Sequence, residues 1–209
     1  MRLVATSDTH FDFPPEFVPD GDVFLHCGDL MYTGYPDEWK GRVESLAALP
    51  HKLKILVPGN HDLHIQNYPG PALQDLRRAG VTVIGIEMGV KPYVELPNGM
   101  SILGLPWVTN LPRWAWHRTE AQIEELLALH NRHKIVASHS PPAGILDGQN
   151  YGVKAYRRWQ HRFRPDYWFC GHIHECHGED AKDGTQFFNV AAQNRDYTAF
   201  ANAPTILDL

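Results

Sequence analysis

Residues 171–174 read Gly-His-Ile-His and directly follow the apolar run Tyr167–Cys170. This run has the composition of a buried strand that ends at Gly171. If the extended geometry continues, His172 and His174 point to the same side of the chain, roughly 6.5–7 Å apart. That separation is too wide for one small ion but suits two ions about 3.5–4 Å apart, as in two-metal hydrolases. The alternative is a loop with two surface histidines, so the assignment depends on ligands elsewhere in the chain.

Polar side chains with oxygen or nitrogen donors follow five apolar runs of the sequence. In chain order they are Asp8 and His10, Asp29, Asn60 with His61 and Asp62, His139, and His172 with His174. In layered α/β sheets, ligand sites form at the carboxyl ends of the strands. One Asp or Asn at a strand end is usually a turn former, but turn chemistry does not explain five such ends together. The pattern therefore predicts a metal centre.

Apolar runs and helical periodicity predict the elements that position these residues. Strands are expected at Arg2–Ala5, Val23–Cys27, Leu53–Val57, Val81–Ile86, Tyr93–Leu96, Ser101–Leu105, Ile135–Ser138, Tyr167–Cys170, Thr185–Val190 and Thr205–Leu209. Helices are expected at Asp37–Leu49, Ala72–Ala79, Thr119–His130 and Val153–Phe163. Because strand–helix alternation flanks a strand-rich middle, the order predicts an α/β layered fold with two sheets.

Length and composition favour one globular domain over residues 1–209, with 43% hydrophobic and 21% charged residues. The net charge of −5 provides no broad basic field, which weighs against long nucleic acid and anionic membranes as partners. Three cysteines without regular spacing argue against a disulfide framework, so we expect a reducing, cytoplasmic location. No apolar stretch approaches the roughly 20 residues of a membrane span, and the N-terminus lacks the shape of a signal peptide.

The five blocks together resemble the calcineurin-like metallophosphoesterase superfamily. The residues that carry the resemblance are Asp8-x-His10, Gly28-Asp29, Gly59-Asn60-His61-Asp62, His139 and Gly171-His172-x-His174. Their flanking residues are similar to those of small metallophosphoesterase-domain-containing proteins and of class III cyclic nucleotide phosphodiesterases. The resemblance implies a four-layer αββα sandwich, in which two mixed β-sheets are flanked by helices and a dinuclear metal site lies at the carboxyl ends of the strands.

The resemblance also implies a role for each of these residues. The implied ligands are Asp8, His10 and His174 for one divalent ion and Asn60, His139 and His172 for the other, with Asp29 as the bridge. Such Asp, Asn and His ligands without thiolate suit Mn²⁺, Fe²⁺ or Zn²⁺. His61 would be the catalytic residue that contacts the phosphate or protonates the leaving oxygen. The alternative for His61 is a structural histidine in a turn.

The chain departs from the protein serine/threonine phosphatases directly after Asp29. Those enzymes continue with a Val-Asp-Arg-Gly-like sequence, whereas this chain has Leu30–Gly34. Tyr32 replaces the aspartate that would orient His61, and the arginine that would grip the phosphate is missing. We therefore expect a phosphodiesterase that acts on small phosphodiesters such as cyclic nucleotides by attack of a metal-bridging hydroxide on phosphorus. The alternatives are a phosphomonoesterase or nuclease of the same fold, and a metal-binding interaction scaffold without catalysis.

Further residues admit both a functional and a structural interpretation. His26, Asp62 and His64 either support the site or pack and face solvent. Four arginines form either a phosphate-binding patch or a solvated helix face: Arg157, Arg158, Arg162 and Arg164. Four aromatic residues either stack on a nucleobase or pack in the core or in a lid: Trp107, Trp114, Trp116 and Tyr151. Cys170 and Cys176 are not expected to bind metal, because the set of hard ligands is complete without them.

Overall fold

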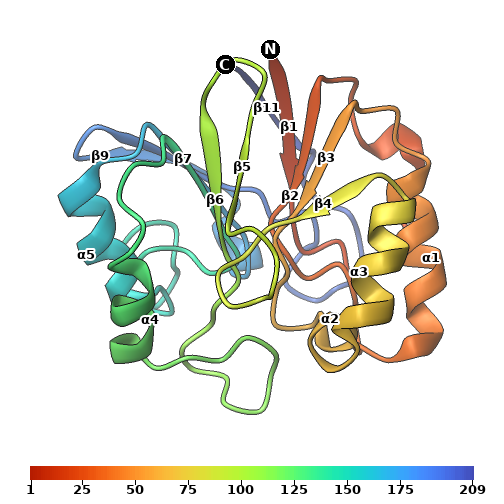
Figure 1. Ribbon diagram of the computed structural model, residues 1–209, viewed down its shortest axis with the longest axis horizontal. Coiled ribbons are helices and arrows are strands. Elements are labelled where there is room, and N and C mark those ends of the chain that lie inside the picture. Colours follow the sequence, from red (N-terminus) through yellow and green to blue (C-terminus); the bar gives the residue numbers. More distant parts are fainter.

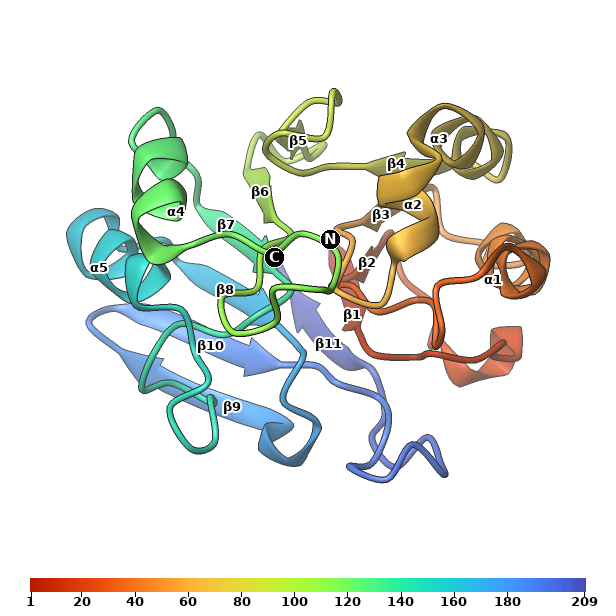
Figure 2. The ribbon, with the colours of Figure 1, turned by 90° about the horizontal axis from the view of Figure 1, so that it is seen from below.

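The structure, a computed structural model, describes residues 1–209 and contains two β-sheets with helices on their outer faces (Figures 1 and 2). The first sheet has the order β11-β1-β2-β3-β4, and the second has the order β5-β6-β7-β8-β10-β9. The helices α1 and α3 cover the first sheet, and α4 and α5 cover the second (Figure 2). This arrangement confirms the four-layer αββα sandwich of two mixed sheets.

The first sheet is parallel except at one edge. Its strands are β1 (Arg2–Thr6), β2 (Val23–His26), β3 (Leu53–Leu56), β4 (Val81–Val83) and β11 (Thr205–Asp208). The strands β1 to β4 pair in parallel, and β11 pairs antiparallel with β1. Parallel pairing requires crossovers, which are supplied by α1 (Pro36–Ala47) and α3 (Pro69–Arg78). The short helix α2 (Leu63–Asn67) precedes α3.

The second sheet has a parallel centre with two antiparallel edges. Its strands are β5 (Tyr93–Glu95), β6 (Ser101–Leu105), β7 (Ile135–Ser138), β8 (Tyr167–Cys170), β9 (Gly178–Lys182) and β10 (Thr185–Asn189). The strands β6, β7, β8 and β10 pair in parallel, whereas β5 and β9 pair antiparallel at the two edges. The crossover helices are α4 (Glu120–Leu127) and α5 (Lys154–Phe163). A Thr119–Gln122 capping box begins α4.

Alternation along the strands separates two layers of buried side chains. In β1, Leu3 and Ala5 lie in a cluster made by residues of both sheets, while Val4 lies in a larger cluster that includes helical residues. The same division separates Ile55 from Leu56 in β3. The sheets are thus buried on both faces, which explains why their strands are continuous apolar runs rather than alternating ones. None of the helices combines the length and apolarity that crossing a lipid bilayer requires.

Most element boundaries agree to within a few residues with those predicted from the sequence, with a few exceptions. The predicted strand Val81–Ile86 ends at Val83. The helix expected from Ala72 begins at Pro69, where the missing N–H of proline is harmless because a first-turn N–H has no helical partner. The strand β9 was not expected, because its residues Gly-Glu-Asp-Ala-Lys include no large apolar side chain. It forms an exposed edge that pairs only with β10. The 3₁₀ helices Pro15–Phe17 and His174–Cys176 were also not expected.

Candidate metal centre

The polar residues that follow β1, β2, β3, β7 and β8 meet between the two sheets. Side-chain ligand atoms lie within 4.8 Å of one another in three groups: Asp8 with His10 and His174, His10 with Asp29 and His61, and Asp29 with His139 and His172. The side-chain Oδ1 of Asn60 lies 2.9 Å from His139 Nε2. The structure therefore brings together every residue that the sequence assigned to the site. Asp29 belongs to two of the groups and lies between the other members.

The imidazole rings of the centre are oriented by backbone carbonyls. The Nδ1 atoms of His10, His139 and His174 lie 2.9, 3.0 and 3.0 Å from the carbonyl oxygens of Met31, Cys27 and Asn194. A hydrogen bond donated by Nδ1–H leaves the lone pair of Nε2 directed into the centre, as a metal-binding histidine requires.

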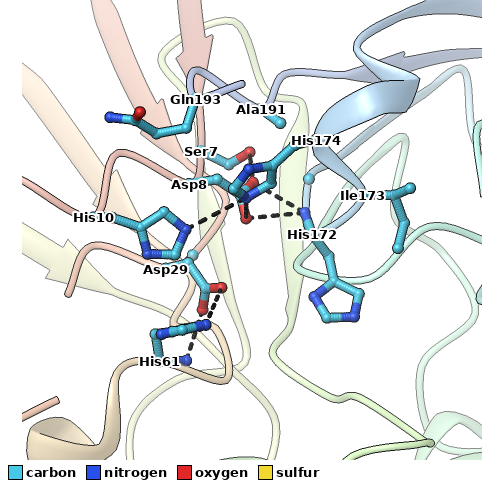
Figure 3. Close-up of polar contacts among 12 residues, drawn as sticks. Ser7, Asp8, His10, Asp29, His61, His172, Ile173, His174, Ala191 and Gln193 are labelled. Atoms are coloured by element: carbon cyan, nitrogen blue, oxygen red, sulfur yellow. Dashed lines mark hydrogen bonds and ion pairs between the residues drawn. The ribbon is translucent and has the colours of Figure 1, made fainter. Parts of the chain in front are cut away.

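These orientations place acceptor atoms against one another. His10 Nε2 lies 3.4 Å from His174 Nε2, and both rings are close to Asp8 (Figure 3). Two lone pairs at this distance repel each other unless a proton or a cation lies between them. The same holds for His139 Nε2 and Asn60 Oδ1. The donor set of this centre therefore fits divalent metal ions of the kind that bind mixed oxygen and imidazole ligands.

Without a metal, the carboxylates of the centre keep protons on two of its histidines. Although burial opposes the charged form, Asp29 raises the pKa of His139 to about 9, with the carboxylate 3.3 Å from Nε2. In the same way, Asp8 raises the pKa of His174 to about 9 against the effect of burial. His139 in turn holds the pKa of Asp29 well below its ordinary value, again against burial. A metal ion must displace these protons when it binds.

The Gly-His-Ile-His segment does not continue the strand as expected from the sequence. The strand β8 ends at Cys170, and His172 has a left-handed backbone with φ of 68°. The prediction of two histidines on the same side of an extended chain is therefore wrong. His174 groups with Asp8 and His10, whereas His172 groups with Asp29 and His139, and its ring points away from that of His174 (Figure 3). A turn, rather than strand geometry, directs the two rings to different parts of the centre.

Backbone strain is concentrated at the centre. Asp8, His10, Asp29 and His172 all have a φ between 51° and 68°, a region that costs a non-glycine residue about 1–3 kcal/mol. Glycine allows the close approach of the strand ends at one key position. A Cβ atom on Gly59 would clash with Asp29 Oδ1 and would lie 2.6 Å from His139 Nδ1. Larger residues there would displace these two side chains.

Asp62 supports the centre in a way that the sequence left undecided. Its side chain is fully buried and accepts four backbone hydrogen bonds, from Gly59, Asp29, Leu30 and Met31 at 2.7–3.0 Å. Burial and the nearby Asp29 raise the pKa of Asp62 to about 7, although bonds from Gly59 and Met31 oppose this shift. Asp62 thus joins the turn that carries Asp29 to the turn that carries Asn60.

His61 is oriented by a backbone carbonyl instead of an aspartate. Its Nδ1–H donates to the carbonyl oxygen of Tyr32, and its Nε2 lies 3.9 Å from Asp29 Oδ2. Its backbone N–H donates to Asp29 Oδ1 at 2.8 Å, and the ring of Trp114 packs 4.3 Å away between centroids. The main chain of Tyr32 therefore does what the missing aspartate side chain would do. No signal in the sequence indicates this, because any residue has a carbonyl group.

The structure places the remaining candidates outside the ligand groups. His26 is fully buried beside Thr9, with Nε2 3.1 Å from the threonine Oγ1. Arg157 and Arg158 form ion pairs with Asp183, Glu120 and Glu124. Trp107 and Trp116 are buried in the core, whereas Trp114 and Tyr151 are exposed. No cysteine belongs to a ligand group.

A pocket of about 300 Å³ opens beside His172. Its walls include Asn110 and Ser140 from the two long loops that follow β6 and β7, together with Tyr151 and Glu175. No lysine or arginine lines it. The pocket therefore offers polar neutral groups and one carboxylate next to the candidate metal centre.

Comparison with known proteins identifies related sequences across the chain. The model of the calcineurin-like phosphoesterase family matches residues 1–176. The UPF0046 protein K07C11.7 of Caenorhabditis elegans is 30% identical over 93% of this chain and 71% of its own length. The human metallophosphoesterase domain-containing protein 1 is 29% identical over 100% of this chain and 71% of its own length.

Solved structures share the fold at low sequence identity. One superposes with a TM-score of 0.67 and 14% identity, over 90% of this chain and 89% of that chain. GAP50, described as the anchor in the inner membrane complex of Plasmodium, superposes with a TM-score of 0.55 and 12% identity, over 92% of this chain and 71% of its own. At these identities, the likeness concerns the fold alone.

Proposed function

The chain belongs to the calcineurin-like phosphoesterase family, and we propose that within this family it is a two-metal phosphodiesterase for small phosphodiesters such as cyclic nucleotides. Family membership supports metal-dependent hydrolysis of phosphoric esters. The choice of two ions, of a diester and of a small substrate rests on the residues of the candidate centre.

The observation that carries the proposal is the position of Asp29 between two sets of ligands. It groups with His10 on one side and with His139 and His172 on the other. The assignment follows the resemblance: Asp8, His10 and His174 would hold one ion, Asn60, His139 and His172 would hold the other, and Asp29 would be shared by both. When bound, two divalent ions acidify a water molecule and stabilise the charge on the phosphoryl oxygens.

His61 has the geometry of a proton donor to the leaving oxygen. Because its Nδ1–H is engaged by the carbonyl of Tyr32, only Nε2 is free to carry a proton into the centre. Nε2 lies 3.9 Å from Asp29 Oδ2, so it faces the residues of the candidate centre. The imidazole can then transfer this proton to the departing oxygen.

The lack of cationic side chains favours a diester over a monoester. No lysine or arginine takes part in the hydrogen bonds and ion pairs of the candidate ligands. A phosphomonoester carries close to two negative charges near neutral pH, whereas a diester carries one and needs less positive charge to bind. The pocket beside His172, which contains no cationic side chain, offers space for the second ester group of a diester.

The test compares a diester with a monoester that have the same leaving group. The full chain, purified and loaded in turn with Mn²⁺, Fe²⁺ or Zn²⁺, is assayed on bis-(p-nitrophenyl) phosphate and p-nitrophenyl phosphate, and then on cyclic nucleotides. We expect kcat/KM to be at least about 10-fold higher for the diester, equivalent to about 1.4 kcal/mol in the barrier. A higher value for the monoester would contradict the diester preference. No turnover of either ester by a protein with two bound ions would support a binding scaffold instead.

A further inference from the structure

The segment 193–200 follows β10 and returns to the candidate metal centre, although it lies beyond the residues that match the family model. Ala192 N–H donates to the carbonyl of Ser7, next to Asp8, at 2.9 Å. Gln193 is buried, and its side-chain amide donates to the carbonyl of Thr9 at 3.0 Å. The segment is therefore anchored to the β1 side of the centre by residues that no motif of the sequence singled out.

A tight turn at residues 194–199 is built around Asn194. Its Oδ1 accepts the backbone N–H of Thr198 at 2.9 Å, and its Nδ2 donates to the hydroxyl of Thr198 at 2.8 Å. The Asn194 N–H donates to the carbonyl of Ala199 at 3.1 Å. These bonds close the turn from both ends and leave Tyr197 near its tip.

One atom of the turn positions both Tyr197 and a candidate ligand. The carbonyl oxygen of Asn194 accepts the backbone N–H of Tyr197 at 3.1 Å and lies 3.0 Å from Nδ1 of His174. Tyr197 has a φ of 58°, which is rare for a bulky residue and persists only where the surroundings determine it. The turn therefore holds Tyr197 in a strained conformation beside the imidazole of His174, which the same turn orients.

The ring of Tyr197 lies against the centre itself. Its centroid is 4.7 Å from that of His174, 4.8 Å from that of His10 and 6.3 Å from that of His61. The ring of Tyr32 packs edge-on against it, with the centroids 5.7 Å apart. The ring of Tyr197 is half-buried. The hydrogen bonds of the turn involve the backbone N–H of Tyr197 and the side chains of Asn194 and Thr198, and none of them involves the Tyr197 hydroxyl group. A phenol held in this place has a hydroxyl donor beside the residues of the centre.

We propose that Tyr197 is a substrate-binding residue whose hydroxyl donates a hydrogen bond to a phosphoryl oxygen of the bound ester. The inference rests on the proposed function, because it assumes that a phosphoryl group lies between His10, His61 and His174. The Tyr197 hydroxyl would supply a neutral hydrogen-bond donor in a chain that lacks the phosphate-binding arginine.

The test uses inorganic phosphate as the probe of the metal-loaded full chain. Tyr197→Phe removes only the hydroxyl, so the ring still packs on His10 and His174. We expect it to retain the metal content and melting temperature of the parent and to bind phosphate about 10-fold more weakly, the loss typical of a hydrogen bond to a charged group in a partly solvated site. The matched control is Tyr35→Phe, since Tyr35 is 67% exposed and outside the centre; it should change nothing.

Each outcome distinguishes one interpretation. Unchanged phosphate affinity in Tyr197→Phe, with metal retained, would show that the ring only packs and would overturn the inference. Loss of metal in this variant would make the phenol a ligand and would overturn it as well. If the parent hydrolyses no phosphate ester but Tyr197→Phe still weakens phosphate binding, the proposed function fails while the contact made by Tyr197 stands.

Discussion

Asp62→Asn tests how the candidate centre is held together, because it replaces one acceptor oxygen by an amide donor. In the parent, Oδ2 accepts from the N–H groups of Gly59 and Asp29, and Oδ1 accepts from those of Leu30 and Met31. An asparagine can accept from one of these pairs only, and its NH₂ group then faces the other pair. The substitution therefore breaks two hydrogen bonds and sets donors against donors at a fully buried position.

The expected cost follows from these two bonds. Hydrogen bonds to a charged group contribute about 1.5–3 kcal/mol each, so two of them amount to about 3–6 kcal/mol. Removal of the charge of Asp62 offsets part of this, because burial and Asp29 already disfavour its ionised form. We therefore expect a loss of about 3 kcal/mol, which most domains survive because they are stable by about 5–15 kcal/mol. Since Asp29 is carried by the same turn, metal affinity should fall together with stability.

Urea unfolding in the presence of chelator measures the stability, and titration with Mn²⁺ or Zn²⁺ measures the affinity. Asp147→Asn is a matched control. Asp147 is also buried, but both of its bonds, from Gly144 and Gly152, reach the same oxygen, so an asparagine can keep both. A loss below about 1 kcal/mol in Asp62→Asn, with unchanged metal affinity, would refute the reasoning, since that is the scale of one ordinary hydrogen bond.

Three further results are expected. Asp29→Asn should lower the affinity for both ions at once, whereas His174→Ala should mainly lower the affinity for one of them. Two normally bound ions by elemental analysis, together with parent turnover, in Asp29→Asn would exclude a bridging role. His61→Ala should keep both ions but lose about 10²–10⁴-fold in kcat. The loss should be larger on cyclic nucleotides than on nitrophenyl esters, because a nitrophenolate leaving group needs little protonation. Equal losses on the two kinds of substrate would indicate that His61 binds the phosphate instead. The pKa values of His139 and His174 are raised from 6.5 to about 9 in the metal-free fold. The contribution of these two protonated histidines to the free energy of unfolding is therefore complete below about pH 6.5 and is lost as pH rises through about 9. Unfolding in chelator should therefore become easier over this range while apparent metal affinity increases; a flat pH profile for both would contradict the proton–metal competition.

The general arrangement of the molecule was accessible from the sequence because it depends on local patterns. Apolar runs such as Leu53–Leu56 and Tyr167–Cys170 correspond to strands, and the helical periodicity around Ile123 corresponds to α4. The strand ends carry the polar residues that meet at the centre, since parallel strands direct their carboxyl ends to the same edge. Short-range pattern and this rule of topology together determine which side chains gather.

The positioning residues were not accessible in this way, because their partners are distant in the chain. Asp62 accepts hydrogen bonds from the N–H groups of Asp29, Leu30 and Met31, which precede it by 31 to 33 positions in the chain. The carbonyl that orients His61 belongs to Tyr32. A main-chain carbonyl has no sequence signature, and a single aspartate after Asn60 and His61 has the same appearance whether it is exposed or buried. The packing of the two turns decides which applies.

By itself, the sequence determined the identity of the donor atoms and the elements that deliver them, since these depend on residue type and on local periodicity. The tertiary structure decided how those atoms are aimed. It turned His172 away from His174 through a left-handed backbone, and it brought Tyr197 against His10 from the far end of the chain. The physical reason is that backbone strain and long-range contacts are stable only when the whole fold surrounds them, so no short segment of the sequence can specify them alone.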